Sequence, residues 1–420
     1  MRRTRQVGMV LTGAVVAAVV ATACSSSAAK TTSVGAGAAP TTADAPTTST
    51  SAPKQPSGPP IKVGYINNEG AVALSVPELR IGAQVGASYV NGTLGGVAGS
   101  PVQIIPCIDD GSPEKAIDCA NQLVEQKVVA VMVGQDTGAD AVVPILKSAE
   151  VPLVGHIQSG TAQMFDPNSF FFGAAAFSYA ADAVKFYAGQ GAKSIEWFIP
   201  DQPTYHQLSD LLVTPAAKAA GVSYKSVYYD PTNPNWSVLG ATAVADHPDV
   251  SGSLLGTDGV CAAFIGALHD AGYTGHILAA SCNGLYTADG SKAVGVDIDS
   301  DHWNPNDPSS APAAKQADIQ AFTAAMKGAG HGDLAGGNAI IGFADVVDLA
   351  QVMGTVSGPV TSASLISALM ATKGAASFDG PAITCDHTLI KGNSACSTGL
   401  LFYRIESDGS LKAVTPDFVG

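Results

Sequence analysis

Short apolar runs alternate with helix-like segments along most of this chain, and this alternation constrains the fold more than any other feature. Ser112 and Pro113, for example, have the order of an N-cap residue and a first-turn proline. A first series predicts strands at 61–66, 102–105, 128–133 and 152–154 and helices at 76–90, 113–124 and 139–149. Such alternation predicts a parallel sheet with helices on both faces.

The alternation begins again after Phe172. This second series predicts strands at 194–199, 222–229, 251–255 and 276–279 and helices at 178–189, 207–220 and 260–271. Two similar series predict an α/β protein with two Rossmann-like lobes, each built on a parallel sheet. Ligands of such sheets bind beyond the carboxyl ends of the strands, next to helix N-termini. We therefore expect a ligand in a cleft between two lobes.

Cys24 stands apart from the six other cysteines, near the N-terminus. It follows an apolar stretch at 7–20, and three arginines precede that stretch. This is the layout of a bacterial lipoprotein signal peptide, although Ala21 occupies a position where such peptides prefer leucine. The stretch is shorter than the roughly 20 residues needed to span a bilayer. We therefore expect removal of 1–23 and lipidation of Cys24 rather than a retained transmembrane anchor.

The segment 24–58 differs in composition from the rest of the chain. It is dominated by Ser, Thr, Ala, Pro and Gly and contains three charged residues. Such a composition cannot bury enough apolar surface to offset its ordering entropy. We expect a disordered tether between the lipid and the folded body, on the extracytoplasmic face of the cell membrane.

The body is acidic. Residues 1–23 carry three of the 21 basic residues and none of the 35 acidic ones, so the mature chain keeps 18 basic residues and a formal charge of −17. This balance argues against nucleic acid or an anionic lipid surface as the partner. The lipid anchor is then the expected contact with the membrane.

A set of short segments, in a fixed order, resembles a known family. They are 62–65, 95–99, 109–110 with Pro113, 116–121, 133–134, 151–153, 201–205 and the hairpin 402–411 with its turn at 408–409. Over 61–414 the chain is similar to the type I periplasmic solute-binding proteins of the leucine/isoleucine/valine-binding family. The resemblance implies a monomeric, non-enzymatic component of an ABC importer that delivers a small molecule to membrane permease subunits, without cofactor or metal.

The resemblance also implies that the chain crosses between the lobes three times. The first lobe would then comprise 59–174 and 302–375, and the second lobe 175–301 and 376–420. A hinge of three strands lets such lobes close over a ligand.

Two loops of the first lobe match the ligand-binding loops of the family. In one loop, Thr137, Gly138 and Ala139 would present first-turn N–H groups and a hydroxyl to a carboxylate or carbonyl. The alternative is that Thr137 or Asp136 merely caps the helix. In the other, Ser159 and Gly160 would contact the ligand, and the alternative is a solvated turn.

In the second lobe, Tyr205 matches an aromatic residue that closes over the ligand in the family. Amino-acid binders also place an acid there to pair with the ligand ammonium, whereas 279–284 contains no carboxylate here. Asp258 could replace it; otherwise the ligand lacks an amine, as amides, urea or small carboxylic acids do. Phe177, Tyr179 and Trp303, with His302 beside it, are weaker ligand-binding candidates, for which hinge or core packing is the alternative. Asn283 is a further weak candidate.

Six body cysteines form an even set in an exported chain, which predicts disulfides. We expect sequential local pairs among the 15 connectivities. The pairs are Cys107–Cys119, Cys261–Cys282 and Cys385–Cys396, the last of them across a hairpin.

Two other functions remain open at this point. A hydrolase would need a catalytic motif, and the chain contains no His-Glu-x-x-His, Cys-x-x-Cys or Gly-x-Ser-x-Gly. His156 and Ser159 are close in sequence but lack a neighbouring acid. A ligand-sensing lipoprotein that signals to a receptor would have the same sequence features as a transport component.

Overall fold

The computed structural model describes residues 55–70, 75–175, 178–254, 258–280, 282 and 284–420. The predicted signal peptide, Cys24 and most of the tether lie outside these residues, as do Phe177 and Asn283. No helix within the described ranges combines the length and the apolar character that crossing a membrane requires.

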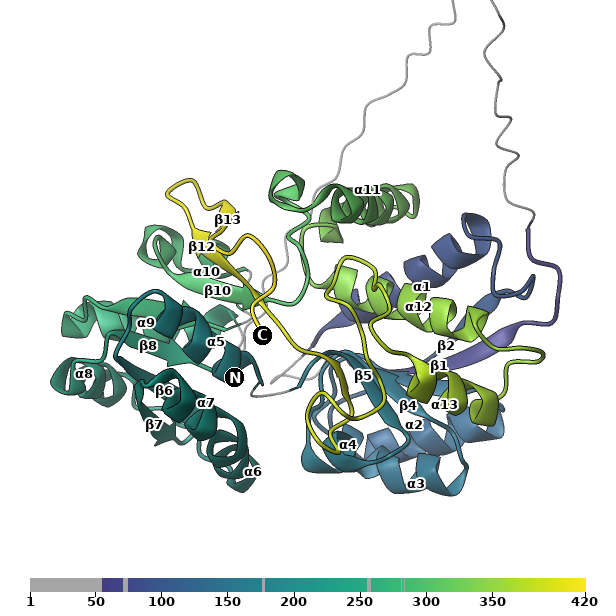
Figure 1. Ribbon diagram of the computed structural model, residues 1–420, viewed down its shortest axis with the longest axis horizontal. Coiled ribbons are helices and arrows are strands. Elements are labelled where there is room, and N and C mark those ends of the chain that lie inside the picture. The colour runs from purple at the N-terminus through teal and green to yellow at the C-terminus, as the bar shows by residue number, and fades with distance from the viewer. Residues whose placement is uncertain (1–54, 71–74, 176–177, 255–257, 281, 283) are drawn as a thin grey trace, which may run out of the picture. The chain divides into compact units, whose positions relative to one another are not determined.

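The first sheet is parallel, with the strand order β11-β5-β4-β3-β1-β2. Figure 1 labels β1, β2, β4 and β5 of this sheet. Its strands are β1 (Ile61–Asn68), β2 (Val102–Asp109), β3 (Ala130–Val133), β4 (Leu153–Gly155), β5 (Ser169–Ala174) and β11 (Ala395–Ser397). The helices of this part of the chain are α1 (Pro77–Gly92), α2 (Pro113–Glu125), α3 (Val143–Ser148), α4 (Thr161–Phe165), α11 (Ala313–Gly328), α12 (Ala339–Gly354) and α13 (Ser362–Ala371).

Helices cover both faces of the first sheet because its strands are apolar on both sides. In β3, Met132 packs in the core formed with α1 and α12, and Val131 packs in the opposite core with α2 and α3. Helices α1 and α12 approach so closely that a Cβ on Gly82 would collide with the Ala339 carbonyl. Glycine at this position therefore sets the helix spacing.

The second sheet has the order β13-β12-β10-β9-β8-β6-β7. Its strands are β6 (Ser194–Pro200), β7 (Ser223–Tyr229), β8 (Val250–Ser253), β9 (His276–Ala279), β10 (Asp297–Ser300), β12 (Leu401–Ile405) and β13 (Leu411–Ala413). Strands β6 to β10 are parallel, and β12 runs antiparallel to both β10 and β13. The predicted final hairpin is confirmed. The helices are α5 (Ser178–Gly189), α6 (Pro203–Leu208), α7 (Thr214–Ala220), α8 (Trp236–Asp246), α9 (Asp258–Ala271) and α10 (Leu285–Asp289).

The third passage between the sheets lies later in the chain than the family resemblance implied. Strand β11 pairs with β5, with Ala395 opposite Phe171, and the Phe171 N–H donates to the Ser394 carbonyl. Cys385 and Cys396 are buried in the core shared by α1 and α12. Residues 376–397 therefore accompany the first sheet rather than the second.

All six body cysteines are joined in the predicted pairs: Cys107–Cys119, Cys261–Cys282 and Cys385–Cys396. The first pair links β2 to α2, and the second links α9 to the segment after β9. The hairpin expected around the third pair is wrong. The chain instead forms turns up to Asn393, and only 395–397 is a strand, because it adds to the edge of the first sheet.

Candidate functional site

Each sheet has a point where the strand order reverses, and the predicted ligand loops lie at these points. In the first sheet the order 2-1-3-4-5 reverses between β1 and β3, and in the second sheet the equivalent place lies between β6 and β8. Ligands of open parallel sheets bind at such points, beyond the carboxyl ends of the strands. Residues 134–139 follow β3, Tyr205 follows β6, and Asp258 follows β8.

The loop after β3 uses much of its hydrogen-bonding capacity internally. The Gly138 N–H donates to Asp136 Oδ1 at 2.7 Å, and the Thr137 hydroxyl donates to the Gly111 carbonyl at 3.0 Å. The helical segment begins as a 3₁₀ turn at Ala139. Asp136 thus closes a local turn before the helical segment, whose N-cap is Gly138 without a side-chain cap. Ligand binding by Thr137, Gly138 and Ala139 stays a prediction.

A buried carboxyl pair, which sequence reasoning missed, lies next to this loop. Asp109 ends β2 and accepts from the Gly111 N–H, and Asp136 follows β3. Burial and then the charge of Asp109 raise the pKa of Asp136 to about 7, and burial also raises the pKa of Asp109. The pair therefore holds a proton near neutral pH. The signal in the sequence was an acid at or shortly after the end of each of two parallel strands, β2 and β3, which flank β1.

The loop after β4 is held by a carboxylate from the preceding helical turn. Asp140 accepts from the Ala162 and Gln163 N–H groups, both at 3.1 Å, so it caps the short helix α4. A Cβ on Gly160 would collide with the Asp140 carboxylate, which explains the glycine. The Ser159 hydroxyl is half-buried and donates to no partner within the described part of the chain. It is therefore available to a ligand.

Tyr205 lies in α6, directly after β6. Its side chain is partly buried and packs against the core between α5 and the second sheet, and burial raises the pKa of its hydroxyl. Beside it, His206 bonds to Asp201 at 2.8 Å and stacks on Tyr228. The α6 turn is thus anchored by aromatic packing, and a ligand contact by Tyr205 stays a prediction.

Asp258 begins α9 at the reversal point of the second sheet. One of its carboxylate oxygens accepts from the Gly284 N–H at 3.2 Å, and a Cβ on Gly284 would collide with the other oxygen. The Cys261–Cys282 bridge joins the same two segments. Burial raises the pKa of Asp258, but the group remains partly exposed. Segment 279–284 contains no acid of its own, but the Asp258 carboxylate lies against its last residue, Gly284.

His156 lies at the centre of a buried polar cluster after β4. Its Nε2 contacts Asp301 Oδ2 at 2.7 Å and its Nδ1 contacts Asp345 Oδ1 at 3.0 Å. The Tyr179 hydroxyl donates to Asp301 at 2.6 Å, and His302 Nδ1 lies 3.1 Å from the same carboxylate. The members come from the end of β4, α5, the segment after β10, and α12. The cluster therefore joins elements of both sheets.

The charge state of this cluster follows from its geometry. Burial alone lowers the pKa of His156, but the charges of Asp301 and Asp345 outweigh burial and raise this pKa well above its ordinary value. The pKa of Asp301 is correspondingly well below its ordinary value, although burial opposes this shift, because His156 and His302 lie beside it. The side-chain atoms of His156, Asp301 and His302 that could coordinate a metal ion lie within 4.8 Å of one another. Their mutual hydrogen bonds account for this proximity.

The sequence missed the acids of this cluster because they are remote along the chain. His156 was expected to lack a neighbouring acid, and this expectation is wrong, since two carboxylates contact it. Tyr179, a weak ligand candidate, bonds to Asp301 within the cluster. Trp303 is buried in the core of the second sheet and makes an edge contact with Phe418, as its packing alternative predicts.

Comparison with known proteins relates this chain to a known family. The model of the periplasmic binding protein family matches residues 60–410. No protein of curated function matches the sequence.

Solved structures share the fold at low sequence identity. An ABC transporter substrate-binding protein from Aeropyrum pernix superposes with a TM-score of 0.71 at 16% identity, over 86% of this chain and 96% of that one. A possible leucine/isoleucine/valine-binding protein from Rhodopirellula baltica gives 0.68 at 15%, over 85% and 97%. A leucine-binding protein from Thermotoga maritima gives 0.63 at 17%, over 86% and 99%. The chain belongs to the periplasmic binding protein family.

Proposed function

We propose that this chain is the lipid-anchored solute-binding protein of an ABC importer, and that it captures a small polar or amphipathic organic molecule between its two lobes. The observation that carries the proposal is a polar group available after a parallel strand of each sheet, one after β4 and one after β8. These groups are the Ser159 hydroxyl and the Asp258 carboxylate. The Ser159 hydroxyl has no hydrogen-bond partner among the described residues, and one Asp258 oxygen is bonded to the Gly284 N–H.

The class of ligand depends on whether an acidic side chain can pair with a ligand ammonium group. A zwitterionic amino acid buries an ammonium, and an unpaired buried cation costs several kcal/mol. Asp258 would have to offset this cost, yet it is only partly buried and already accepts from Gly284. We therefore propose a ligand without a buried ammonium, such as an amide or a small organic acid.

Calorimetric titration of two variants tests this ligand class, using the best ligand from a thermal-shift screen of amino acids, amides and organic acids. Ser159→Ala is expected to weaken binding by about 2- to 12-fold, the effect of one lost neutral hydrogen bond. Asp258→Asn is expected to change affinity less than about threefold. A branched-chain amino acid whose affinity falls by about tenfold or more in Asp258→Asn would refute the ligand class.

Lipid anchoring is tested separately. Cys24→Ser is expected to leave an unlipidated precursor, because the thioether to the lipid requires the thiol. Partitioning between detergent and aqueous phases measures the outcome: wild type should enter the detergent phase and the variant the aqueous phase. Entry of both proteins into the aqueous phase would contradict the anchor without affecting the ligand-binding proposal.

The two alternative functions are a hydrolase and a ligand-sensing lipoprotein. In a hydrolase His156 would need a nitrogen directed at Ser159, but both ring nitrogens contact carboxylates. The structural neighbours named above are binding proteins. Signalling to a receptor remains the alternative to transport, and a permease gene adjacent to this one would favour transport.

A further inference from the structure

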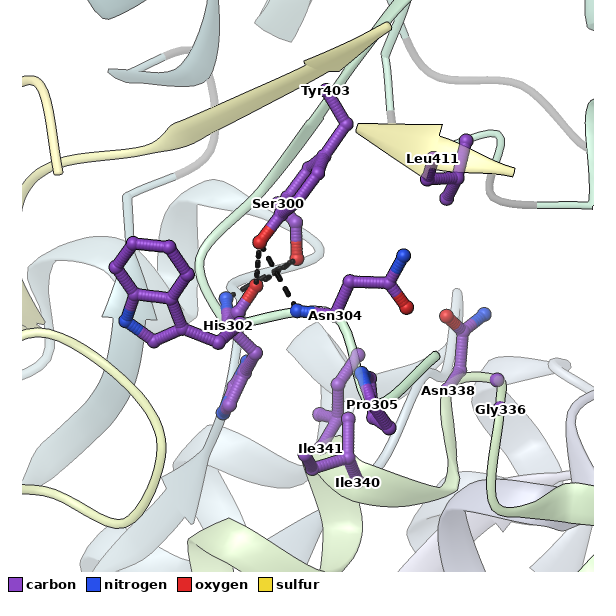
Figure 2. Close-up of a pocket in the computed structure, with 12 residues that line it drawn as sticks. Ser300, His302, Asn304, Pro305, Gly336, Asn338, Ile340, Ile341, Tyr403 and Leu411 are labelled. Carbon is purple, nitrogen blue, oxygen red and sulfur yellow. Dashed lines mark hydrogen bonds between the residues drawn. The ribbon is translucent and has the colours of Figure 1, made fainter. Parts of the chain in front are cut away.

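The central polar groups of a small pocket at the start of α12 are bonded to one another (Figure 2). The pocket has a volume of about 40 Å³ and lies between the segment after β10, the start of α12 and the hairpin of β12 and β13. The Asn304 N–H donates to the Tyr403 hydroxyl at 3.0 Å, and the Ser300 hydroxyl donates to the His302 carbonyl at 2.9 Å. Among the described side chains that line the pocket, only Asn304 has a buried polar atom without a partner. A single atom of this kind does not define a site.

Three such atoms occur at the carboxyl ends of β1 and the two strands beside it. They are side-chain oxygens without a hydrogen-bond donor: Asn68 Oδ1 at the end of β1, Asp109 Oδ2 at the end of β2 and Asp136 Oδ2 after β3. The three residues are 2%, 4% and 0% exposed, in the same order. A buried polar atom without a partner costs free energy. A donor or a cation beside these oxygens would remove that cost.

The backbone holds both carboxyl groups by their other oxygen. Asp109 Oδ1 accepts from the Gly111 N–H at 3.2 Å, and Asp136 Oδ1 accepts from the Gly138 N–H at 2.7 Å. The two carboxyl groups also interact with each other, as the pair described above. Each group therefore keeps one oxygen without a donor, and the two groups are direct neighbours.

Asn68 brings its amide to the same place. It lies directly opposite Asp109 in the register of β1 and β2, so the two side chains share one face of the sheet. A Cβ on Gly111 would lie 2.5 Å from Asn68 Nδ2 and 2.6 Å from the hydroxyl of Thr137, the residue after Asp136. The Gly111 N–H in turn bonds to Asp109. The three strand ends therefore converge on Gly111, where only glycine fits.

No basic side chain balances the two acids. Neither Asp109 nor Asp136 takes part in a salt bridge within the described part of the chain. Asp110 adds a further negative charge beside them. The negative charge and the acceptor oxygens together favour a cation over a neutral donor.

The type of oxygen narrows the choice of cation. Ca²⁺ accepts carboxylate and amide oxygens together, about six to eight in all, whereas Mg²⁺ usually keeps several of its waters. The three oxygens are buried and leave little room for such waters. The set contains no imidazole or thiolate, the ligands that zinc and copper favour.

We propose that Asn68 Oδ1, Asp109 Oδ2 and Asp136 Oδ2 bind a calcium ion. A site with two charged ligands is expected to be weak, in the range of about 10⁻⁴–10⁻³ M that extracellular calcium modules show. The ion would join the ends of β1 and β2 to the turn after β3, where the predicted ligand loop begins. The proposal depends neither on the identity of the solute nor on transport.

Calorimetric titration of calcium chloride into the chelator-treated protein, at constant pH and ionic strength, tests the proposal. Wild type should bind one ion saturably. Asp136→Asn keeps the acceptor for Gly138 and removes one charged ligand, so it should weaken binding about tenfold or more. Asp270→Asn removes the same charge from an exposed position of α9 and should bind calcium as wild type does. Magnesium should bind wild type about tenfold or more weakly than calcium.

Urea unfolding gives an independent measure, because an ion that binds only the folded state raises the unfolding midpoint. Calcium at about 10 mM should raise the midpoint of wild type and of Asp270→Asn. The rise should be absent in Asp136→Asn. Asn68→Ala removes the neutral ligand, and its calcium affinity should fall by about 2- to 12-fold.

Four outcomes would overturn the proposal. Wild type might bind no calcium saturably, or Asp136→Asn might bind it as tightly as wild type does. An equal loss of affinity in Asp270→Asn would mean that calcium binds the acidic surface in general. Equal affinity for magnesium would contradict the calcium assignment. If circular dichroism shows that Asp136→Asn is unfolded, Asn68→Ala decides the case, and unchanged calcium affinity in that variant would exclude the site.

Discussion

Replacement of His156 by leucine is expected to lower the free energy of unfolding by about 3–5 kcal/mol, the usual cost of removing one partner from a buried ion pair. The imidazole lies between Asp301 and Asp345, and all three side chains are buried. Without His156 the two carboxylates would face each other across an apolar replacement. Urea unfolding at pH 6 measures the loss.

Tyr179→Phe is the matched control, because it removes one hydrogen bond to Asp301 and leaves the charges in place. Its expected cost is about 1 kcal/mol. A loss of equal size in both variants would show that His156 contributes no more than a neutral hydrogen bond.

The His156 contribution should also depend on pH. The folded-state pKa of His156 is raised, so its stabilisation is fully present below the unfolded-state value and declines as pH rises toward the folded-state value. The difference between wild type and His156→Leu should therefore shrink from about pH 6.5 upward. A difference that grows with pH would contradict an imidazolium in this cluster.

Asp136→Asn is expected to raise the free energy of unfolding by about 2–4 kcal/mol at pH 8 and by little at pH 4. The folded-state pKa of Asp136 is about 7, against an ordinary value of 3.8, so ionisation destabilises the folded state as pH rises through this range. Asparagine keeps the acceptor for the Gly138 N–H and removes the charge. Urea unfolding at intervals from pH 4 to 8 gives the two profiles.

Asp270→Asn provides the control for this experiment, because Asp270 lies exposed near the end of α9. Its profile should run parallel to that of wild type. A parallel profile for Asp136→Asn as well would mean that Asp109 and Asp136 do not share a proton.

Much of the fold was predictable because local signals and global architecture agree. Apolar runs of strand length, such as 130–133, bury all their side chains only in a sheet that is covered on both faces. Ser112 and Pro113 correctly mark the start of α2. Strand β11 was missed because its three residues, Ala395–Ser397, have no periodicity of their own. Its pairing with β5 is decided by contacts between segments distant in sequence. For the same reason the third passage between the sheets was expected too early in the chain.

The candidate site was predictable in its loops and not in its contacts. The family resemblance indicated the segments around Ser159 and Asp258, and each of these segments follows a strand. It could not indicate that Asp140 holds the first of these loops or that Asp301 and Asp345 meet at His156. Such contacts join residues that are distant in sequence, and one sequence contains no signal for them.

The pairing of β11 with β5 has a consequence for how the chain acquires its structure. Ala395 must meet Phe171 before the first sheet is complete, and β12 must meet β10 before the second is complete. Both closures use the last part of the chain, so neither sheet can be completed before residues 395–405 have been synthesised. Contacts this distant in sequence slow folding. Completion of the two sheets is therefore expected to be a late step of folding, and it depends on the same short stretch of chain in both.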